Sequence, residues 1–278
     1  MTGTVLHGVH NTLAGLRKWN LERDDESDPN GRIYRDEQGN IYHSVTRILK
    51  ETAPEHQKEW LANWAAREGN IAFRDSAAQR GTEMHNHAEY LLKTTNKVAR
   101  ATANRKGSWK TGADGLERLP KSIFSWAYDK AIAGAPTVPW SSAGYARGLA
   151  GWIGGNVTQA HAIEFSIHSP FGYAGTCDCL ADVVSPHDGR SYLTIVDWKS
   201  SERARSEELL SGYIDQLGAY STGLHHLTGL RVKAGAVVVA RRTGAPQVRY
   251  LTELEIRGAE VRFAERVERY FAKLTLTT

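Results

Sequence analysis

Acidic side chains interrupt two otherwise apolar stretches of the sequence, residues 176–184 and 192–199. The turn-forming sequence Ser-Pro-His-Asp-Gly at 185–189 separates them, so we expect a β-hairpin. Asp178 lies in the first strand and Asp197 in the second. A buried carboxylate is unfavourable unless something pairs with it, and a divalent cation bound by both would do so. The alternative is a surface hairpin whose polar side faces water, because a D-x-K tripeptide is common by chance.

The alternation of side chains across a strand decides which of these residues can converge. It places Asp178, Leu180 and Asp182 on one face of the first strand, and it places Asp197 and Lys199 on one face of the second. Two carboxylates and an ammonium group could therefore meet.

The only two cysteines, Cys177 and Cys179, flank Asp178. Alternation predicts that both face away from it, as small core residues and not as a zinc pair. Nothing indicates a disulfide framework, which fits a reducing compartment.

The 278 residues are 41% hydrophobic and 24% charged, which is ordinary for a globular protein of one large or two small domains. No apolar run could span a membrane and no signal peptide is evident, so we expect a soluble intracellular protein without a membrane partner. Most of the eight tryptophans, among them Trp60, Trp64 and Trp126, are expected in the core.

Positive charge is concentrated between residues 90 and 113, where there is no acidic residue. Two interpretations stay open: a mobile loop that contacts phosphates and stacks a base on Trp109, or a solvated linker. The cations of this segment are Lys93, Lys97, Arg100, Arg105, Lys106 and Lys110.

A helix is predicted over about residues 71–93. Gly81, His85 and Glu89 lie along one face of it, and the glycine permits close approach by another backbone or a ligand. Taken alone, a helical histidine is more often structural than a ligand.

Glu164 lies among apolar residues in a strand predicted over 159–168, which would pair with the strand of Asp178. It either joins the acidic site or lies at a sheet edge.

The remaining pattern predicts an α/β fold with a mixed sheet and helices on its faces. The expected elements are a small hairpin at 32–44, a helix over 119–134, strands at 234–240 and 248–254, and a closing helix over 260–273. The serines and acids of residues 200–208 predict a helix N-terminus, followed by a helix to about residue 227.

Four short motifs follow one another along the chain: R-G-x-x-x-H (Arg80, Gly81, His85), G-T-x-D (Gly175, Thr176, Asp178), D-W-K-S-S (residues 197–201) and Q-x-x-x-Y (Gln216, Tyr220). In this order they resemble the RecB-like branch of the PD-(D/E)XK nuclease superfamily, and in particular its phage-encoded and CRISPR-associated exonucleases. The resemblance covers residues 81–220 well and the flanks only by general architecture.

The resemblance implies a restriction-endonuclease-like core, with a mixed central sheet flanked by helices. We expect a mainly helical N-terminal region over 1–70, the nuclease core over 71–278, and a helical or loop insertion over about 94–158, all within one compact domain. The CRISPR-associated members hold an iron–sulfur cluster on four cysteines. This chain has only two cysteines, so we expect no cluster here.

The implied activity is metal-dependent hydrolysis of DNA, from free ends and with a preference for single strands. Lys199 would orient the attacking water or neutralise charge on the phosphate. The expected ligands of Mg²⁺ or Mn²⁺ are His85, Asp178, Asp197 and the backbone carbonyl of Trp198. The imidazole favours Mn²⁺.

Gln216 and Tyr220 would contact DNA or hold Lys199, and Glu164 would belong to the catalytic group. The residues expected to bind nucleic acid are Arg80, Lys97, Arg100, Arg105, Lys106, Trp109, Lys110, Ser200 and Ser201. The expected setting is DNA recombination, repair or replication in the cytoplasm of a bacterium or phage-infected cell, with recombination or replication proteins as partners. The alternatives are a structure-specific endonuclease and a non-catalytic module that binds DNA ends or a partner.

Overall fold

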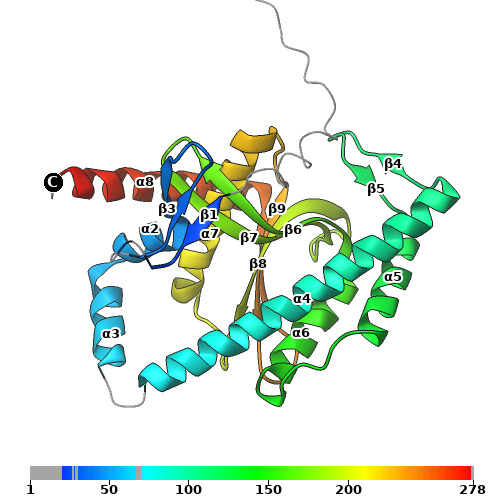
Figure 1. Cartoon of the computed structure of the whole chain (residues 1–278), viewed down its shortest axis with the longest axis horizontal. Helices are drawn as coiled ribbons and strands as arrows, with labels where there is room; N and C mark the ends of the chain where they lie inside the picture. The colour runs from blue at the N-terminus through cyan, green and yellow to red at the C-terminus, as the bar shows by residue number, and fades with distance from the viewer. Residues whose placement is uncertain (1–20, 27, 29–30, 67–69, 277–278) are drawn as a thin grey trace, which may run out of the picture.

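A mixed β-sheet with helices on both faces organises the protein (Figure 1). The computed structural model describes residues 21–26, 28, 31–66 and 70–276. Eight strands form the main sheet in the order β1-β2-β3-β7-β8-β9-β10, and β6 pairs with β7. They are β1 (Glu22–Asp24), β2 (Ile33–Arg35), β3 (Ile41–Ser44), β6 (Val157–Ser169), β7 (Tyr173–Val184), β8 (Ser191–Ser200), β9 (Ala234–Ala240) and β10 (Gln247–Thr252).

The pairs β3–β7 and β8–β9 are parallel, and the other pairs in this sheet are antiparallel. The predicted mixed sheet and the predicted β7–β8 hairpin are therefore confirmed. A separate small hairpin consists of β4 (Lys110–Thr111) and β5 (Glu117–Arg118).

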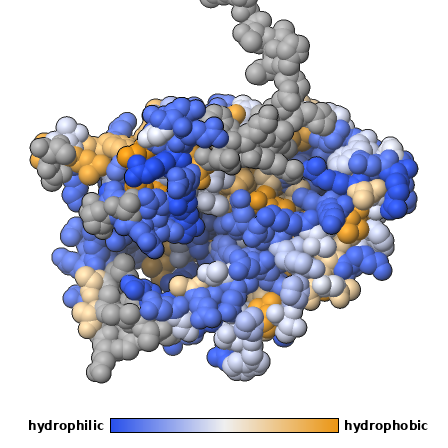
Figure 2. Space-filling model, in the orientation of Figure 1, coloured by the Kyte–Doolittle hydropathy of each residue, from blue (hydrophilic) through white to orange (hydrophobic). Residues whose placement is uncertain are grey.

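Two groups of helices bury the two faces of the sheet. One face packs against α4 (Asn70–Lys106), α5 (Lys121–Ala133) and α6 (Trp140–Asn156). The other packs against α2 (Val45–Glu51), α7 (Glu207–Thr228) and α8 (Glu253–Thr275), while α3 (Glu55–Ala65) precedes α4. The surface crossed by α4 is mainly hydrophilic (Figure 2).

Strand β9 shows why the sheet needs two covering layers. Val237 and Val239 lie in the core beneath α7 and α8, whereas Ala236 and Val238 lie in the core beneath α4 and α6. Such a strand is apolar on both faces, which explains its uninterrupted hydrophobic sequence.

Several helices begin where the sequence provides a capping side chain. Ser44 and Ser206 accept hydrogen bonds from the first turns of α2 and α7. Thr252 and Glu255 form a reciprocal capping box at the start of α8, which begins seven residues earlier than predicted.

The described N-terminal part contains the hairpin expected at 32–44, formed by β2 and β3, and the helices α2 and α3. Strands β1, β2 and β3 extend the central sheet, because β3 pairs directly with β7. Residues 1–20 of that region lie outside the described residues.

The expectation for the tryptophans is wrong at Trp126, whose side chain lies on the outer side of α5 with 46% of its surface exposed. The side chains of Trp60 and Trp64 lie outside the described part of the chain. Within the described ranges, no helix is both long enough and apolar enough to cross a membrane.

Candidate active site

Glu164 on β6 and Asp178 on β7 fall opposite each other, where both strands break the regular alternation of side chains. Cys177 and Phe165 pack into the core beneath α7, whereas Cys179 and Ile163 pack beneath α4. Residues two apart would otherwise share a face.

The backbone of Glu164 has a φ of 46°, and it is the one non-glycine residue in the described chain with a positive φ. Irregularities of this kind re-aim side chains beside functional sites. Here they direct Glu164 and Asp178 together toward α4.

This break corrects two predictions. Leu180 faces α7, so Asp178 does not share its face, and Cys177 and Cys179 do not face the same side. Alternation holds along most of β7 but fails opposite Glu164, where the positive φ turns the backbone without a change of register. Both cysteines are free and buried, as predicted.

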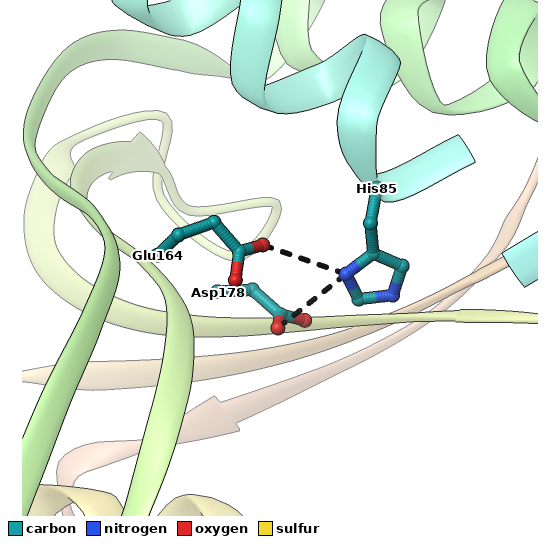
Figure 3. A group of neighbouring side chains, drawn as sticks. All are labelled: His85, Glu164 and Asp178. Atoms are coloured by element: carbon teal, nitrogen blue, oxygen red, sulfur yellow. Dashed lines mark ion pairs between the residues drawn. The ribbon is translucent and has the colours of Figure 1, made fainter. Parts of the chain in front are cut away.

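His85 completes a cluster with these two carboxylates (Figure 3). The ligand atoms of His85, Glu164 and Asp178 all lie within 4.8 Å of one another. His85 Nδ1 is 3.5 Å from Glu164 Oε1 and 3.6 Å from Asp178 Oδ1. Glu164 therefore fits both alternatives: it lies beside His85 and Asp178, and its strand β6 is an edge strand that pairs only with β7 in the described sheet.

The two nitrogens of His85 have different partners. Nε2 lies 3.1 Å from the backbone carbonyl of Trp198, which can only accept, so Nε2 carries a proton. Nδ1 is the nitrogen that faces the carboxylates and is available to a cation. Helix α4 passes close to β8 here, since a Cβ added to Gly81 would lie 3.4 Å from Ser200 Oγ.

The cluster places two carboxylates against a single imidazole. Burial, and then the charge of Asp197, raise the pKa of Asp178 to about 7, although His85 and Lys199 act in the opposite direction. Burial lowers the pKa of His85, but Glu164 and Asp178 outweigh it and raise the pKa overall. Glu164 Oε1 is buried and has no hydrogen-bond partner within the described part of the chain. These carboxylates suit a bound cation.

Asp197 and Lys199 form a second, adjoining pair. Lys199 Nζ lies 2.8 Å from Oδ1 and 2.7 Å from Oδ2 of Asp197, whose side chain is 1% exposed. Burial lowers the pKa of Lys199, but Asp197 and Asp178 outweigh it and raise the pKa, so the side chain is an ammonium. Asp178 Oδ2 accepts a 2.7 Å hydrogen bond from the backbone N–H of Trp198, which links the two acidic strands.

Helix α7 supports this pair from the opposite face. Gln216 Nε2 donates to Tyr220 Oη at 2.6 Å, and both side chains are buried. Burial, and then the charge of Asp197, raise the pKa of Tyr220 well above its usual value. Such buried groups fit a supporting role and not contact with DNA. Tyr213, to which the sequence assigns no role although it shares their helix face, has its ring 5.1 Å from Lys199 Nζ.

Three residues expected to bind nucleic acid lie at the same end of the sheet. Arg80 contacts Glu202 at 3.5 Å and lies 5.9 Å from the ring of Tyr145. Ser200 ends β8, and Ser201 Oγ donates to the carbonyl of Arg203.

Most of the basic segment after residue 90 is neither a loop nor a linker, because α4 continues unbroken to Lys106, and Lys110 follows in β4. Arg105 lies 20 residues beyond His85, which corresponds to about 30 Å along a helix. The segment therefore runs away from the site. Its expected DNA-binding cations are all exposed: Lys97, Arg100, Arg105, Lys106 and Lys110.

Trp109 also differs from the expectation. Its indole Nε1 donates to Asn104 at 2.7 Å, and its ring packs against the small cluster that contains Ala99 and Ala103. It closes the end of α4 and is not presented to a base.

The fold and this cluster agree with a comparison against known protein families. The model of the PD-(D/E)XK nuclease superfamily matches residues 10–276, so the chain belongs to this superfamily. This confirms the resemblance seen in the four motifs.

Similar proteins include mitochondrial genome maintenance exonuclease 1 from human, which is 24% identical over 254 residues, covering 86% of this chain and 61% of the relative. The mouse protein of that name is 24% identical over 75% of this chain and 52% of its own length. The Xenopus tropicalis protein is 24% identical over 73% and 49%. The chain thus spans about half to three fifths of the length of these relatives.

Proposed function

We propose that the protein is a metal-dependent deoxyribonuclease that hydrolyses DNA from free ends and prefers single strands. The observation that carries this proposal is the convergence of His85, Glu164 and Asp178 beside the Asp197–Lys199 pair. A module that only binds DNA or a partner would not need two buried carboxylates beside a lysine. This combination argues against a non-catalytic module.

His85, Glu164 and Asp178 would hold the cation, and Asp197 adjoins them. A divalent ion bound there would act as a Lewis acid toward a scissile phosphate and lower the pKa of a water. Oxygen ligands favour Mg²⁺ or Mn²⁺, and the imidazole of His85 favours Mn²⁺ between the two.

Lys199 would neutralise charge that develops on the phosphate or orient the attacking water. Asp197 holds its ammonium group and the ring of Tyr213 lies beside it, so the side chain is positioned before substrate arrives. The backbone N–H of Trp198 fixes one oxygen of Asp178, which leaves the other directed at His85.

Cleavage from ends is supported by the names of the relatives, which are exonucleases. A single nuclease site cuts one strand at a time, which suits single-stranded substrates. The setting in bacterial or phage recombination, repair or replication stays a prediction. The relatives are animal proteins named as mitochondrial and give no support to a bacterial or phage host.

The test compares linear single-stranded DNA with the same DNA circularised and with a blunt duplex, each with Mn²⁺, with Mg²⁺ and with EDTA. We expect rapid loss of the linear strand with either metal, slow loss of the duplex, and none with EDTA. Cleavage of circles as fast as linear strands would move the structure-specific endonuclease to first place. An absence of cleavage under all conditions would favour the binding module.

A further inference from the structure

The parallel pairing of β8 with β9 brings a second surface close to the site. Ser200 at the end of β8 pairs with Ala240 at the end of β9, so the chain after each strand emerges at the same edge of the sheet. After β9 this chain is the turn 241–246, which leads into β10. The edge where Lys199 lies therefore continues onto this turn.

Helix α6 lies against this turn and encloses a groove with it. The groove has a volume of about 600 Å³, and Gly144, Gly148 and Gly151 line it on the helix side. At one end α6 and the turn touch, because a Cβ on Gly144 would lie 2.0 Å from the carbonyl oxygen of Arg242. Farther along, a Cβ on Gly151 would meet nothing within 4 Å.

The groove carries positive charge that no acidic residue of the described part of the chain neutralises. Arg147 from α6 and Arg242 from the turn line it, and both are exposed. Neither forms an ion pair with any residue that the structure describes. Glycines leave the helix backbone open to close approach, and arginines offer hydrogen bonds to phosphate oxygens.

A large aromatic side chain lies beside this charge. Trp140, the first residue of α6, is 82% exposed, and the guanidinium of Arg242 is 5.1 Å from its ring. A tryptophan gains the free energy of burying its large apolar surface only when that surface is covered, so this side chain suits contact with a partner.

The groove is anchored to the helix that carries His85. Ser142 of α6 donates a hydrogen bond to Glu83 of α4, and Arg80 of α4 lies over the ring of Tyr145 of α6. Glu83 precedes His85 by two residues, so the start of α6 is fixed close to the metal-binding cluster.

We propose that this groove binds the single-stranded part of the substrate next to the scissile phosphate, with phosphates on Arg147 and Arg242 and an unpaired base on Trp140. The inference rests on the proposed nuclease function and adds a path for the strand. A groove of this volume matches a small-ligand pocket more than a duplex, and stacking on an aromatic face requires an unpaired base.

The first experiment measures binding of a fluorescein-labelled thymidine oligonucleotide of about 12 nucleotides by anisotropy, with Lys199→Ala as the background so that the probe stays intact. Trp140→Ala should weaken binding at least about fivefold. Arg147→Ala combined with Arg242→Ala should weaken it and lower the salt slope by about 0.7 for each lost phosphate contact. Trp126→Ala and Arg269→Ala, an exposed tryptophan and an exposed arginine elsewhere, serve as matched controls and should stay within about twofold.

The second experiment fills the groove from its open side. Gly151→Glu should weaken binding strongly because it adds bulk and negative charge, Gly151→Gln should weaken it less, and Gly151→Ala should leave it unchanged. Alanine favours the helix over glycine, so the melting temperatures of these variants will show whether each remains folded.

Unchanged affinity in Trp140→Ala and Gly151→Glu, together with active wild-type enzyme, would overturn the groove assignment and leave the nuclease function intact. An equal loss of duplex binding in Trp140→Ala would overturn the single-stranded occupant. A wild-type protein that neither binds nor cleaves DNA would instead contradict the proposed function itself.

Discussion

Glu164 combines two features that are unfavourable in a protein without a cation. Its left-handed backbone costs a non-glycine residue about 1–2 kcal/mol. Its Oε1 atom is buried, and the described residues offer it no hydrogen bond, only an imidazole nitrogen 3.5 Å away. Both are explained if the residue is held in place to bind a metal ion.

We expect Glu164→Gly to stabilise the metal-free protein by about 1 kcal/mol, because glycine adopts a positive φ without strain. Mn²⁺ at about 100 times its dissociation constant should stabilise the wild type by about 2.7 kcal/mol, and the variant should lose most of this response. Denaturant unfolding with and without Mn²⁺ measures both effects.

Glu164→Gln is the control for this experiment, since it keeps the strained backbone and removes the charge. It should lose the response to Mn²⁺ without the gain in metal-free stability. A wild type whose unfolding does not respond to metal would contradict the assignment.

At the residue scale, the sequence identifies the site residues that belong to motifs with a regular spacing. His85, Asp178, Asp197 and Lys199 belong to short motifs whose order identifies them. The position of Glu164 depends on a matched break in two strands, and nothing local in residues 159–168 signals it. For this reason the sequence does not decide whether Glu164 belongs to the acidic site or lies at a sheet edge.

At the element scale, the site depends on close contact between β7 and α7. Gly175 makes this possible, because a Cβ there would lie 2.8 Å from Tyr220 Cε1 and 3.3 Å from Val45 Cγ2. The glycine of the G-T-x-D motif thus has a packing role: it makes room for the tyrosine of the Q-x-x-x-Y motif.

Gly175→Ala should therefore destabilise the protein by about 1–3 kcal/mol, the usual effect of overpacking a core. It should also reduce cleavage, because the ring of Tyr220, which feels the charge of Asp197, must shift. Gly212→Ala on α7 is the control, since a Cβ there meets nothing within 4 Å, and it should stabilise the helix by up to about 1 kcal/mol. Thermal unfolding measures both, and equal stability of the two variants would contradict this role for Gly175.

The elements that the sequence predicted well have strong local signals, such as the apolar run of β9. The C-terminal half of α4 was missed because its threonines and asparagines favour helix weakly. Within the fold, Thr95 and Thr102 satisfy their hydroxyls by bonding to the carbonyls of Leu91 and Val98. Helix α6 was missed because of its glycines, although Gly144 and Gly154 are needed for contacts with Arg242 and Tyr128.

At the scale of the whole molecule, two layers of helices hold one sheet, and residues far apart in sequence meet at one edge of it (Figure 1). The basic residues beyond Tyr90 could be found from the sequence but not placed, because a long helix carries them away from this edge. The sequence does not group Arg147 with Arg242, because they come together only where α6 packs beside the turn after β9.

The most direct test of a nuclease centre at this edge is single-turnover cleavage of linear single-stranded DNA by wild type and Lys199→Ala with Mn²⁺, with binding of the same DNA measured in parallel. Removal of the ammonium group should reduce cleavage by several orders of magnitude, because its role is chemical. DNA binding should stay within about tenfold, or about 1.4 kcal/mol. Near-normal cleavage by Lys199→Ala would contradict the assignment of this site.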